Sequence, residues 1–350
     1  MIKRHLLILL LIKICLVLPV RGQNLFDKDD VLNIILRGPV AELLKDRGEN
    51  PQYHSLTLNY SDAQQKGISV PLRIRVRGNF RRQKGNCGYP PLMLNFSDEF
   101  TRGTLFEGQD KIKLVMPCQG DKYVVREFLV YKMYNQVTPM SFRARLVKVT
   151  LEETDGKPRS YEPFFGILLE DENQMATRNG MVAIDRQLVR PEQTQPVEFL
   201  TMAVFQYLIA NTDWSVQYRQ NIKLIAADSL SKPYAVPYDF DHAGMVWAPY
   251  AKPAPELMMS SVRERRYRGY CLTDMRHFER AFQVFNELKE GIYVLYRDNA
   301  LLDETYKKAT IRFLDDFYKT ISTPGKASFD FQYPCRAEGT GNVVIKGLKN

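Results

Sequence analysis

The sequence predicts an α+β protein with two lobes, a β-rich lobe followed by a mainly helical one. The chain has 350 residues, 45% of them hydrophobic and 11% aromatic, which is enough apolar material for a packed core. Its first half alternates apolar and polar residues over short runs. Its second half repeats apolar residues at helical spacing.

The first residues have the pattern of a secretory signal peptide. Lys3 and Arg4 precede an apolar run over residues 6–18, and a cleavage point follows near Gly22. The run is too short to span a bilayer comfortably, so we expect no stable membrane insertion after cleavage. The sequence therefore predicts an exported protein that is periplasmic, on the cell surface or secreted.

The charge of the chain argues against one class of partner. Cleavage of residues 1–22 removes four basic and no acidic residues, so the formal net charge falls from +9 to +5. A mildly basic chain of this kind is not a nucleic-acid binder by composition. Arginine clusters at residues 73–82 and 263–268 suit acidic or phosphorylated ligands, or else are solvated faces of strands and helices.

Four cysteines follow the predicted cleavage point: Cys87, Cys118, Cys271 and Cys335. In an exported protein an even number of cysteines permits two disulfides, here with three possible connectivities. Sequence neighbourhood favours Cys87 with Cys118 and Cys271 with Cys335. The spacing fits no standard zinc pattern.

The first lobe is predicted to be antiparallel and to contain one helix. Residues 24–46 have the pattern of short helical or mixed structure. Strands are predicted at residues 54–59, 68–76, 91–96, 111–115, 145–152 and 164–169. Apolar spacing predicts a helix from Val124 to Val137, which carries Arg126 and Glu127 near its start.

The second lobe is predicted to be mainly helical. A helix begins at Pro196, because proline suits a first turn, and Asn211 closes it. Two short strands follow at residues 222–225 and 234–238. Two further helices are predicted at residues 274–290 and 301–321, and the tail after Pro324 is predicted to be irregular.

Four polar side chains in the second lobe are candidates for chemistry: Asp213, Asn221, Asp239 and Asp241. Asp213 follows the apolar helix, and Asn221 opens the first short strand. Alternation along an extended segment points Asp239 and Asp241 to one side. Magnesium prefers one or two carboxylates together with substrate phosphates, so the pattern predicts a site for a divalent metal and a phosphate.

The order of these parts matches that of protein kinases. A β-rich lobe with one helix comes first, and then an aspartate, an asparagine and an Asp-Phe-Asp segment. The spacing from Asp213 to Asn221 is longer than in the eukaryotic signature, and the chain has neither an H-R-D motif nor a glycine-rich phosphate loop of the usual spacing.

Whole segments make the similarity more specific. In order, they are Arg75-Val76-Arg77-Gly78-Asn79, Leu94-Asn95-Phe96, Lys113-Leu114, Phe165-Gly166-Ile167-Leu168-Leu169-Glu170, Asn211-Thr212-Asp213, Asn221 and Pro237-Tyr238-Asp239-Phe240-Asp241. Over roughly residues 65–245 the chain resembles the CotH-type atypical kinases, a family named from a spore-coat protein. The predicted units are a signal peptide at 1–22, an N-terminal extension at 23–60, and a kinase-like domain at 61–350 with lobes at about 61–175 and 176–325 and an irregular tail at 326–350.

This resemblance implies a protein-kinase-like fold that phosphorylates Ser or Thr of a protein, using ATP with magnesium or manganese. Asp213 is then the catalytic aspartate. Asn221 and Asp239 or Asp241 hold the metal, and Glu170 lies near the hinge where an adenine rests.

One kinase part has no clear counterpart. Kinases need a strand lysine on the phosphates, paired with a helix glutamate, and Met93 stands where a lysine would be natural. Lys111 or Lys113 is a candidate, with Glu127 as its helix partner, and the sequence does not choose between the two lysines.

Two alternatives therefore stay open. One is a catalytically weak pseudokinase or surface-binding module with the same fold, and the other is a metal-dependent phosphoesterase that uses the same carboxylates. Taken singly, Asp213 is also explained as a helix-terminus residue and Asn221 as a turn residue. Trp214 and Trp247 are predicted to be core or lobe-interface residues.

Overall fold

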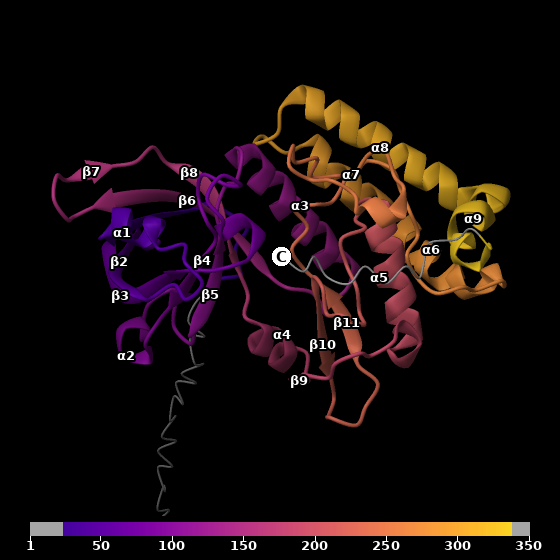
Figure 1. The fold of residues 1–350 in the computed structure, drawn as a ribbon, viewed down its shortest axis with the longest axis horizontal. Coiled ribbons are helices and arrows are strands. Elements are labelled where there is room, and N and C mark those ends of the chain that lie inside the picture. Colours follow the sequence, from indigo (N-terminus) through magenta and orange to yellow (C-terminus); the bar gives the residue numbers. More distant parts are fainter. Residues whose placement is uncertain (1–23, 338–350) are drawn as a thin grey trace, which may run out of the picture.

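The computed structural model describes residues 24–337, so the predicted signal peptide at 1–22 lies outside the described residues. The described chain is a mixed α+β protein, as predicted, with a β-rich part followed by a mainly helical part. Helix α3 (Asp121–Val137) lies between the two parts (Figure 1). It packs against strands of the first part and against helix α7 (Lys289–Arg297) of the second.

The larger sheet contains β1 (Leu32–Gly38), β2 (His54–Ser61), β3 (Gly67–Val76), β4 (Leu92–Asn95), β5 (Lys111–Val115), β6 (Ala144–Glu153), β7 (Arg159–Ser160) and β8 (Phe164–Leu169). Their order across the sheet is β1-β2-β3-β4-β5-β8-β6-β7, and β1 also pairs with β6. This additional pairing closes the sheet into a barrel.

The prediction of an antiparallel first lobe is wrong for one pair of strands, β1 and β6, called the β1–β6 seam below. β1 and β6 run parallel, with Leu32 opposite Val147 and Gly38 opposite Glu153. Parallel neighbours need a long crossover, and here it includes α3 and four strands of the barrel. The segment predicted to be short helical or mixed, residues 24–46, contains β1 followed by α1 (Val40–Lys45).

Alternation along the strands fills the barrel with apolar side chains. In β3, for example, Val70, Leu72, Ile74 and Val76 are buried, and the residues between them are exposed. A separate core combines α3 with the helices and the small sheet of the second part. α3 is therefore buried against both parts of the molecule.

The remaining helices are α2 (Asp98–Thr101), α4 (Glu172–Arg178), α5 (Pro196–Leu208), α6 (Glu279–Glu287), α8 (Glu304–Ser322) and α9 (Pro324–Phe331). A second, antiparallel sheet has the order β11-β10-β9, with β9 (Val182–Ala183), β10 (Ile222–Ala226) and β11 (Tyr234–Pro237). Single 3-10 turns are η1 (Phe80–Arg82), η2 (Pro191–Gln193), η3 (Pro255–Leu257), η4 (Met275–Phe278) and η5 (Tyr333–Cys335).

The end of the described chain is helical, although an irregular tail was expected after Pro324. Pro324 occupies the first turn of α9, where its missing N–H is no loss. Ala327 and Phe331, one helical turn apart, are both buried. These two apolar contacts hold the helix in place.

Two disulfides confirm the pairing favoured by sequence neighbourhood. Cys87 is bonded to Cys118, and Cys271 to Cys335. The first bridge joins the connection between β3 and β4 to the segment that leads into α3. The second ties η5 to the segment before η4.

Opening the first bridge with Cys87→Ser and Cys118→Ser is expected to lower the free energy of unfolding by about 3–4 kcal/mol. The two cysteines are 31 residues apart, and a free connection of that length adds conformational entropy to the unfolded chain. Urea unfolding followed by circular dichroism measures the loss. An unchanged unfolding midpoint would contradict the expectation.

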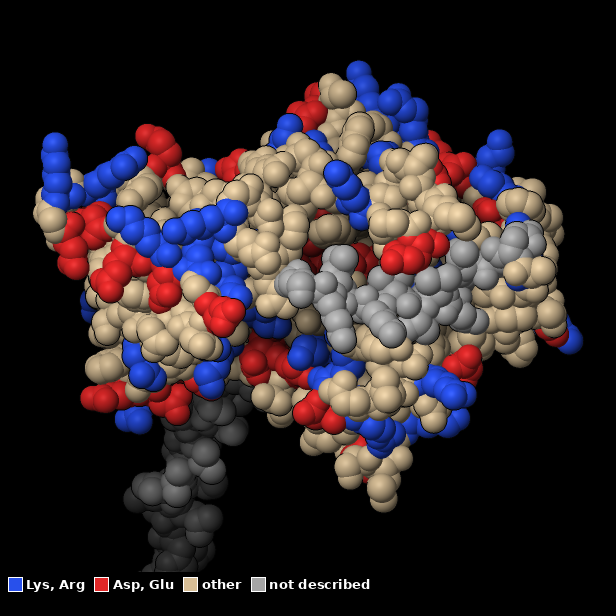
Figure 2. Space-filling view, viewed as in Figure 1, with Lys and Arg blue, Asp and Glu red and all other residues tan. Residues whose placement is uncertain are grey.

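Charges of both signs are interspersed over the face shown in Figure 2. Among residues 24–337, no helix is long and apolar enough to cross a membrane.

Candidate functional site

The four polar residues singled out in the sequence lie on two loops, and the loop with Asp239 contacts Tyr131 of α3. Asp213 follows α5, Asn221 comes directly before β10, and Asp239 and Asp241 follow β11. The antiparallel pairing of β10 with β11 sets the start of one strand opposite the end of the other. The two loops therefore leave the small sheet at the same end of its strands.

Asn221 fixes the carboxylate of Asp213. Its Nδ2 donates to Oδ2 of Asp213 at 2.9 Å and to the backbone carbonyl of Asp213 at 2.8 Å. Gln220 Nε2 donates to the other carboxylate oxygen. Because both amide hydrogens of Asn221 are used, its Oδ1 is the side-chain atom left for a further ligand.

Arg268 holds the backbone on both sides of Asp213. Its guanidinium donates to the carbonyl oxygen of Thr212 and, at 2.9 Å, to that of Trp214. Burial raises the pKa of the Asp213 carboxyl, and the nearby His242 opposes the rise. A fixed carboxylate with a raised pKa is suited to orient a hydroxyl group and accept its proton.

The backbone at Asp239 and Asn221 is left-handed, with φ of 61° and 51°. Asp and Asn enter this region more readily than most residues. The N–H of Asp239 donates to the hydroxyl of Tyr131 at 2.8 Å, and the N–H of Tyr238 donates to the carbonyl of Asn221 at 3.0 Å. Such conformations persist where the surroundings hold them, and they gather at functional sites.

Buried carboxylates gather between α3 and the segment after β11. Glu127 is 2% exposed and Asp241 is 5% exposed. Burial, and then the charges of Asp241 and Asp239, raises the pKa of Glu127 well above its ordinary value. Glu127 Oε1 has no hydrogen-bond partner among the described residues. The cluster therefore has a surplus of acceptors and negative charge, which favours a cation.

Arg81, in η1, supplies a cation that sequence reasoning missed. Its Nη1 lies 3.7 Å from Oδ2 of Asp241, and its Nη2 donates to the carbonyl of Met116. Burial alone would lower the pKa of Arg81, but nearby anionic groups, Asp241 foremost, raise it above its ordinary value. Arg81 is thus held as a charged group inside the cluster.

Two sequence features pointed towards Arg81. It belongs to the arginine cluster at residues 73–82, and Cys87 follows it on the same connection between β3 and β4. The bridge from Cys87 to Cys118 holds this connection against the start of α3, and the N–H of Gly88 donates to the carbonyl of Cys118 at 3.3 Å. Only the folded connection shows that the arginine reaches Asp241.

The two candidate lysines have different surroundings. The side chain of Lys111 is 52% exposed and pairs with Asp110 at 3.4 Å. Lys113 Nζ lies 4.7 Å from the ring centroid of Tyr238, and the charge of Asp239 acts on it. The structure therefore brings Lys113, and not Lys111, to the loop that carries Asp239.

The strand that carries Lys113 is β5, which leads into α3, and Lys113 lies opposite Met93 on the neighbouring β4. A lysine thus lies on the strand next to Met93, and its contact with phosphates stays a prediction. Among the described residues no ion pair joins Lys113 to Glu127, which is near Asp241 and Arg81 instead.

The ionisation of Lys113 gives a pH-dependent contribution to stability. Burial, with Arg77 and Lys223 nearby, lowers the pKa of Lys113 from 10.5 to about 8. Between these two pH values the unfolded chain binds the proton and the folded chain does not, so stability rises with pH in this window.

Lys113→Met is expected to remove this rise. The difference in unfolding free energy, wild type minus Lys113→Met, should increase by on the order of 2–3 kcal/mol across the window. Urea unfolding at a series of pH values from about 7.5 to 10.5, the ordinary pKa of lysine, measures this difference. Lys111→Met is the matched control. A flat difference would show that the pKa of Lys113 is not lowered.

Glu170 lies directly after β8, where the chain passes to α4, and it is 4% exposed. Arg178 donates to its two carboxylate oxygens at 3.0 and 2.9 Å, and the N–H of Arg143 donates to it at 2.9 Å. The carboxylate of Glu170 is therefore engaged within the protein and fixes the connection between the two parts.

The donors at the site can hold a metal only together with other ligands. In the part of the chain that the structure describes, no three His, Cys, Asp or Glu side chains lie close enough to bind an ion alone. Magnesium commonly takes one or two carboxylates and completes its shell with water and phosphate oxygens. Asp239 and Oδ1 of Asn221 are suitable as these one or two protein ligands. Asp241 is also suitable if Arg81 moves away from it.

Comparison with known proteins adds little. No protein-family model matches the chain, and no curated protein matches its sequence. Among solved structures, the chain is similar to the proinflammatory kinase CtkA of Helicobacter pylori, with 10% sequence identity and a TM-score of 0.39 over 74% of this chain and 97% of that chain.

Proposed function

We propose that the protein is an atypical kinase with a two-lobed, protein-kinase-like fold, which transfers the γ-phosphate of ATP to Ser or Thr of a protein. The observation that carries this proposal is the Asp213 carboxylate, fixed by Asn221, in one site with Asp239 and Lys113. Kinases combine an aspartate for the hydroxyl nucleophile, an asparagine and an aspartate for metal, and a lysine for the phosphates. The motifs similar to those of the CotH-type kinases support the same function.

Each residue has a role in this proposal. Asp213 orients the substrate hydroxyl and takes its proton as the oxygen attacks the γ-phosphorus, and the bond from that phosphorus to the β–γ bridging oxygen breaks to release ADP. Lys113 contacts the phosphates of ATP, and Asn221 with Asp239 or Asp241 holds magnesium or manganese. The metal, when bound, neutralises charge on the phosphates.

The second candidate, a pseudokinase or surface-binding module, is favoured by a different observation. Arg81 already pairs with Asp241, and Glu127 forms no ion pair with Lys113 among the described residues. A nucleotide would have to displace Arg81 from Asp241 before both aspartates could face a metal.

The two disulfides support the proposal of an exported protein, because such bridges persist in oxidising compartments. The bridge from Cys87 to Cys118 fixes the connection that carries Arg81. We therefore expect reduction of this bridge to loosen the connection that carries Arg81.

Asp213→Asn is expected to lower phosphate transfer about 10²- to 10⁴-fold, because the proton acceptor is lost. The assay follows labelled phosphate from ATP into protein in the presence of magnesium or manganese. Asp298→Asn, an exposed aspartate at the end of α7, is the matched control. Urea unfolding of both variants shows whether the fold is retained.

Three outcomes separate the candidates. Equal transfer by wild type and Asp213→Asn rules out the proposed kinase mechanism. Thermal stabilisation by ATP without any transfer identifies a pseudokinase. Phosphate release from phosphoesters without ATP identifies the phosphoesterase.

A further inference from the structure

The buried cluster of Glu127, Asp241 and Arg81 contains unmatched polar atoms of both kinds. Among residues 24–337, Oε1 of Glu127 is an acceptor without a hydrogen-bond partner, and Nε of Arg81 is a donor without one. Nη1 of Arg81 lies 3.7 Å from Oδ2 of Asp241, which is close enough for an ion pair but too far for a hydrogen bond. The guanidinium therefore supplies the charge that the carboxylates need, but it does not match their hydrogen-bonding atoms.

The two carboxylates are held at the same loop. The backbone N–H of Phe240, between Asp239 and Asp241, donates to the carboxylate of Glu127. The hydroxyl of Tyr250 donates to Oδ2 of Asp241 at 3.0 Å. The charge of Arg81 acts on both carboxylates. Glu127 and Asp241 thus have fixed positions on either side of one cation.

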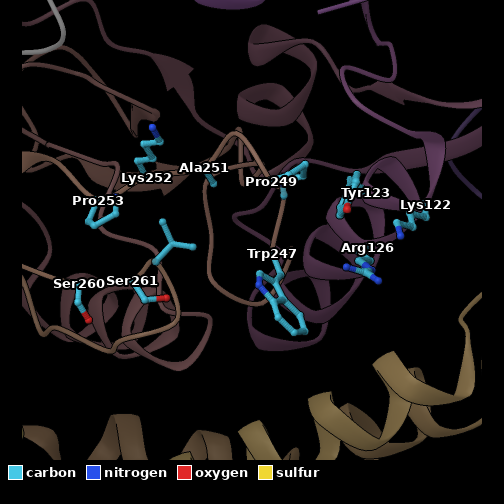
Figure 3. A pocket seen from close by; sticks show the side chains of 12 residues that line it. Lys122, Tyr123, Arg126, Trp247, Pro249, Ala251, Lys252, Pro253, Ser260 and Ser261 are labelled. Carbon is cyan, nitrogen blue, oxygen red and sulfur yellow. The ribbon is translucent and has the colours of Figure 1, made fainter. Parts of the chain in front are cut away.

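The neighbouring cation in α3 is engaged elsewhere. Arg126 directly precedes Glu127, but it is paired with Asp303 at 3.5 Å. It lines a pocket of about 450 Å³ beside Trp247 (Figure 3). Trp247 was predicted to be a core or lobe-interface residue, but it is 47% exposed there. Arg126 is therefore not the counter-charge of Glu127, and Arg81 has that role.

The connection between β3 and β4 carries Arg81 to the carboxylates and is anchored away from them. Cys87 of this connection is bonded to Cys118, and Arg47 donates to the carbonyl of Cys87 at 2.9 Å. Nη2 of Arg81 itself donates to the carbonyl of Met116, two residues before Cys118. None of these contacts involves Glu127 or Asp241. The side chain of Arg81 is thus the part of the connection that closes the cluster.

We propose that Glu127 and Asp241 form a divalent-cation site, which the guanidinium of Arg81 occupies in the state described. Magnesium and manganese take oxygen ligands, and one or two carboxylates with water are enough for magnesium. The unmatched Oε1 of Glu127 and a carboxylate oxygen of Asp241 supply that number. Glu127 is not among the metal ligands named above, so this position is additional to the one at Asn221 and Asp239.

The arginine and the metal ion exclude each other at this position, because two cations would repel there. In the proposed kinase, on which this consequence rests, the contact between Arg81 and Asp241 is autoinhibitory. It keeps a second metal ion out until the side chain of Arg81 leaves.

Binding of Mn²⁺ alone, counted by electron paramagnetic resonance near neutral pH, tests the proposal. Arg81→Met should bind one Mn²⁺ ion more than wild type, at least about ten-fold more tightly at this position, because a fixed positive charge is removed. Arg102→Met makes the same change of charge at an exposed arginine and should bind Mn²⁺ like wild type. Equal binding by wild type and Arg81→Met would overturn the proposal.

A second substitution assigns the added ion to Glu127. Arg81→Met with Glu127→Gln should lose the added Mn²⁺ ion. Arg81→Met with Glu99→Gln, which changes an exposed glutamate, should keep it. Retention of the added ion without the Glu127 carboxylate would show that the site is elsewhere and would overturn the proposal.

Urea unfolding with and without Mn²⁺ gives a second reading, because Arg81→Met is expected to be less stable than wild type. A ligand that binds only the folded chain stabilises it. Mn²⁺ should raise the unfolding midpoint of Arg81→Met more than that of wild type, and it should refold the variant if the variant is unfolded without metal. A midpoint that Mn²⁺ does not raise, or a variant that it does not refold, would overturn the proposal. Neither reading uses ATP or turnover, so a failure of this proposal is distinguishable from a failure of phosphate transfer.

Discussion

Lys113→Met is expected to lower phosphoryl transfer by about 10²- to 10³-fold, whereas Lys111→Met should stay within about three-fold of wild type. Lys113 lies beside Tyr238 and feels the charge of Asp239, so its loss removes a fixed positive group from the phosphate site. Lys111 is 52% exposed and paired with Asp110. Both residues are lysines on strand β5, so Lys111→Met is a matched control for Lys113→Met.

The measurement is kcat/KM for ATP, together with thermal stabilisation by ATP. The second reading still reports on Lys113 if turnover is low, because loss of a phosphate contact weakens nucleotide binding. Equal effects of the two substitutions on both readings would show that Lys113 does not contact the phosphates.

Arg81→Met is expected to lower the free energy of unfolding by about 3–5 kcal/mol, because it leaves buried carboxylates without their cation. Asp241 and Glu127 are almost fully buried, and Arg81 lies 3.7 Å from Asp241. Urea unfolding at constant pH measures the loss. Arg102→Met, at an exposed arginine, should change it by less than about 0.5 kcal/mol.

A double-mutant cycle separates the ion pair from simple packing. Adding Asp241→Asn to Arg81→Met should recover part of the stability, since one of the unpaired charges is removed. Additive losses would show that Arg81 acts through its contact with Met116 and its packing, and not through the carboxylates.

Local patterns in the sequence were enough to predict most of the elements. The strands at residues 68–76 and 111–115 and the helix that ends at Val137 follow directly from period-two and helical spacing. The α+β class and the pairing of Cys87 with Cys118 are confirmed. Each depends on residues that are close in sequence.

Features that depend on distant parts of the chain were missed. The parallel pairing of β1 with β6 joins segments on either side of four strands and three α-helices. Arg81 reaches Asp241 through a connection with no regular period, and Trp247 is exposed although indoles are usually buried. The roles of Asp213, Asn221, Asp239 and Asp241 stay predictions, although the structure brings their loops together.

The β1–β6 seam sets an order for folding. β1 precedes every other strand, yet its parallel partner β6 is complete only at Glu153, so the barrel cannot close until that residue is available. Cys87 and Cys118 both precede β6 in the chain, so their disulfide can form before β1 pairs with β6. Closing so long a connection is slow, and until then β1 keeps an unpaired edge open to other chains.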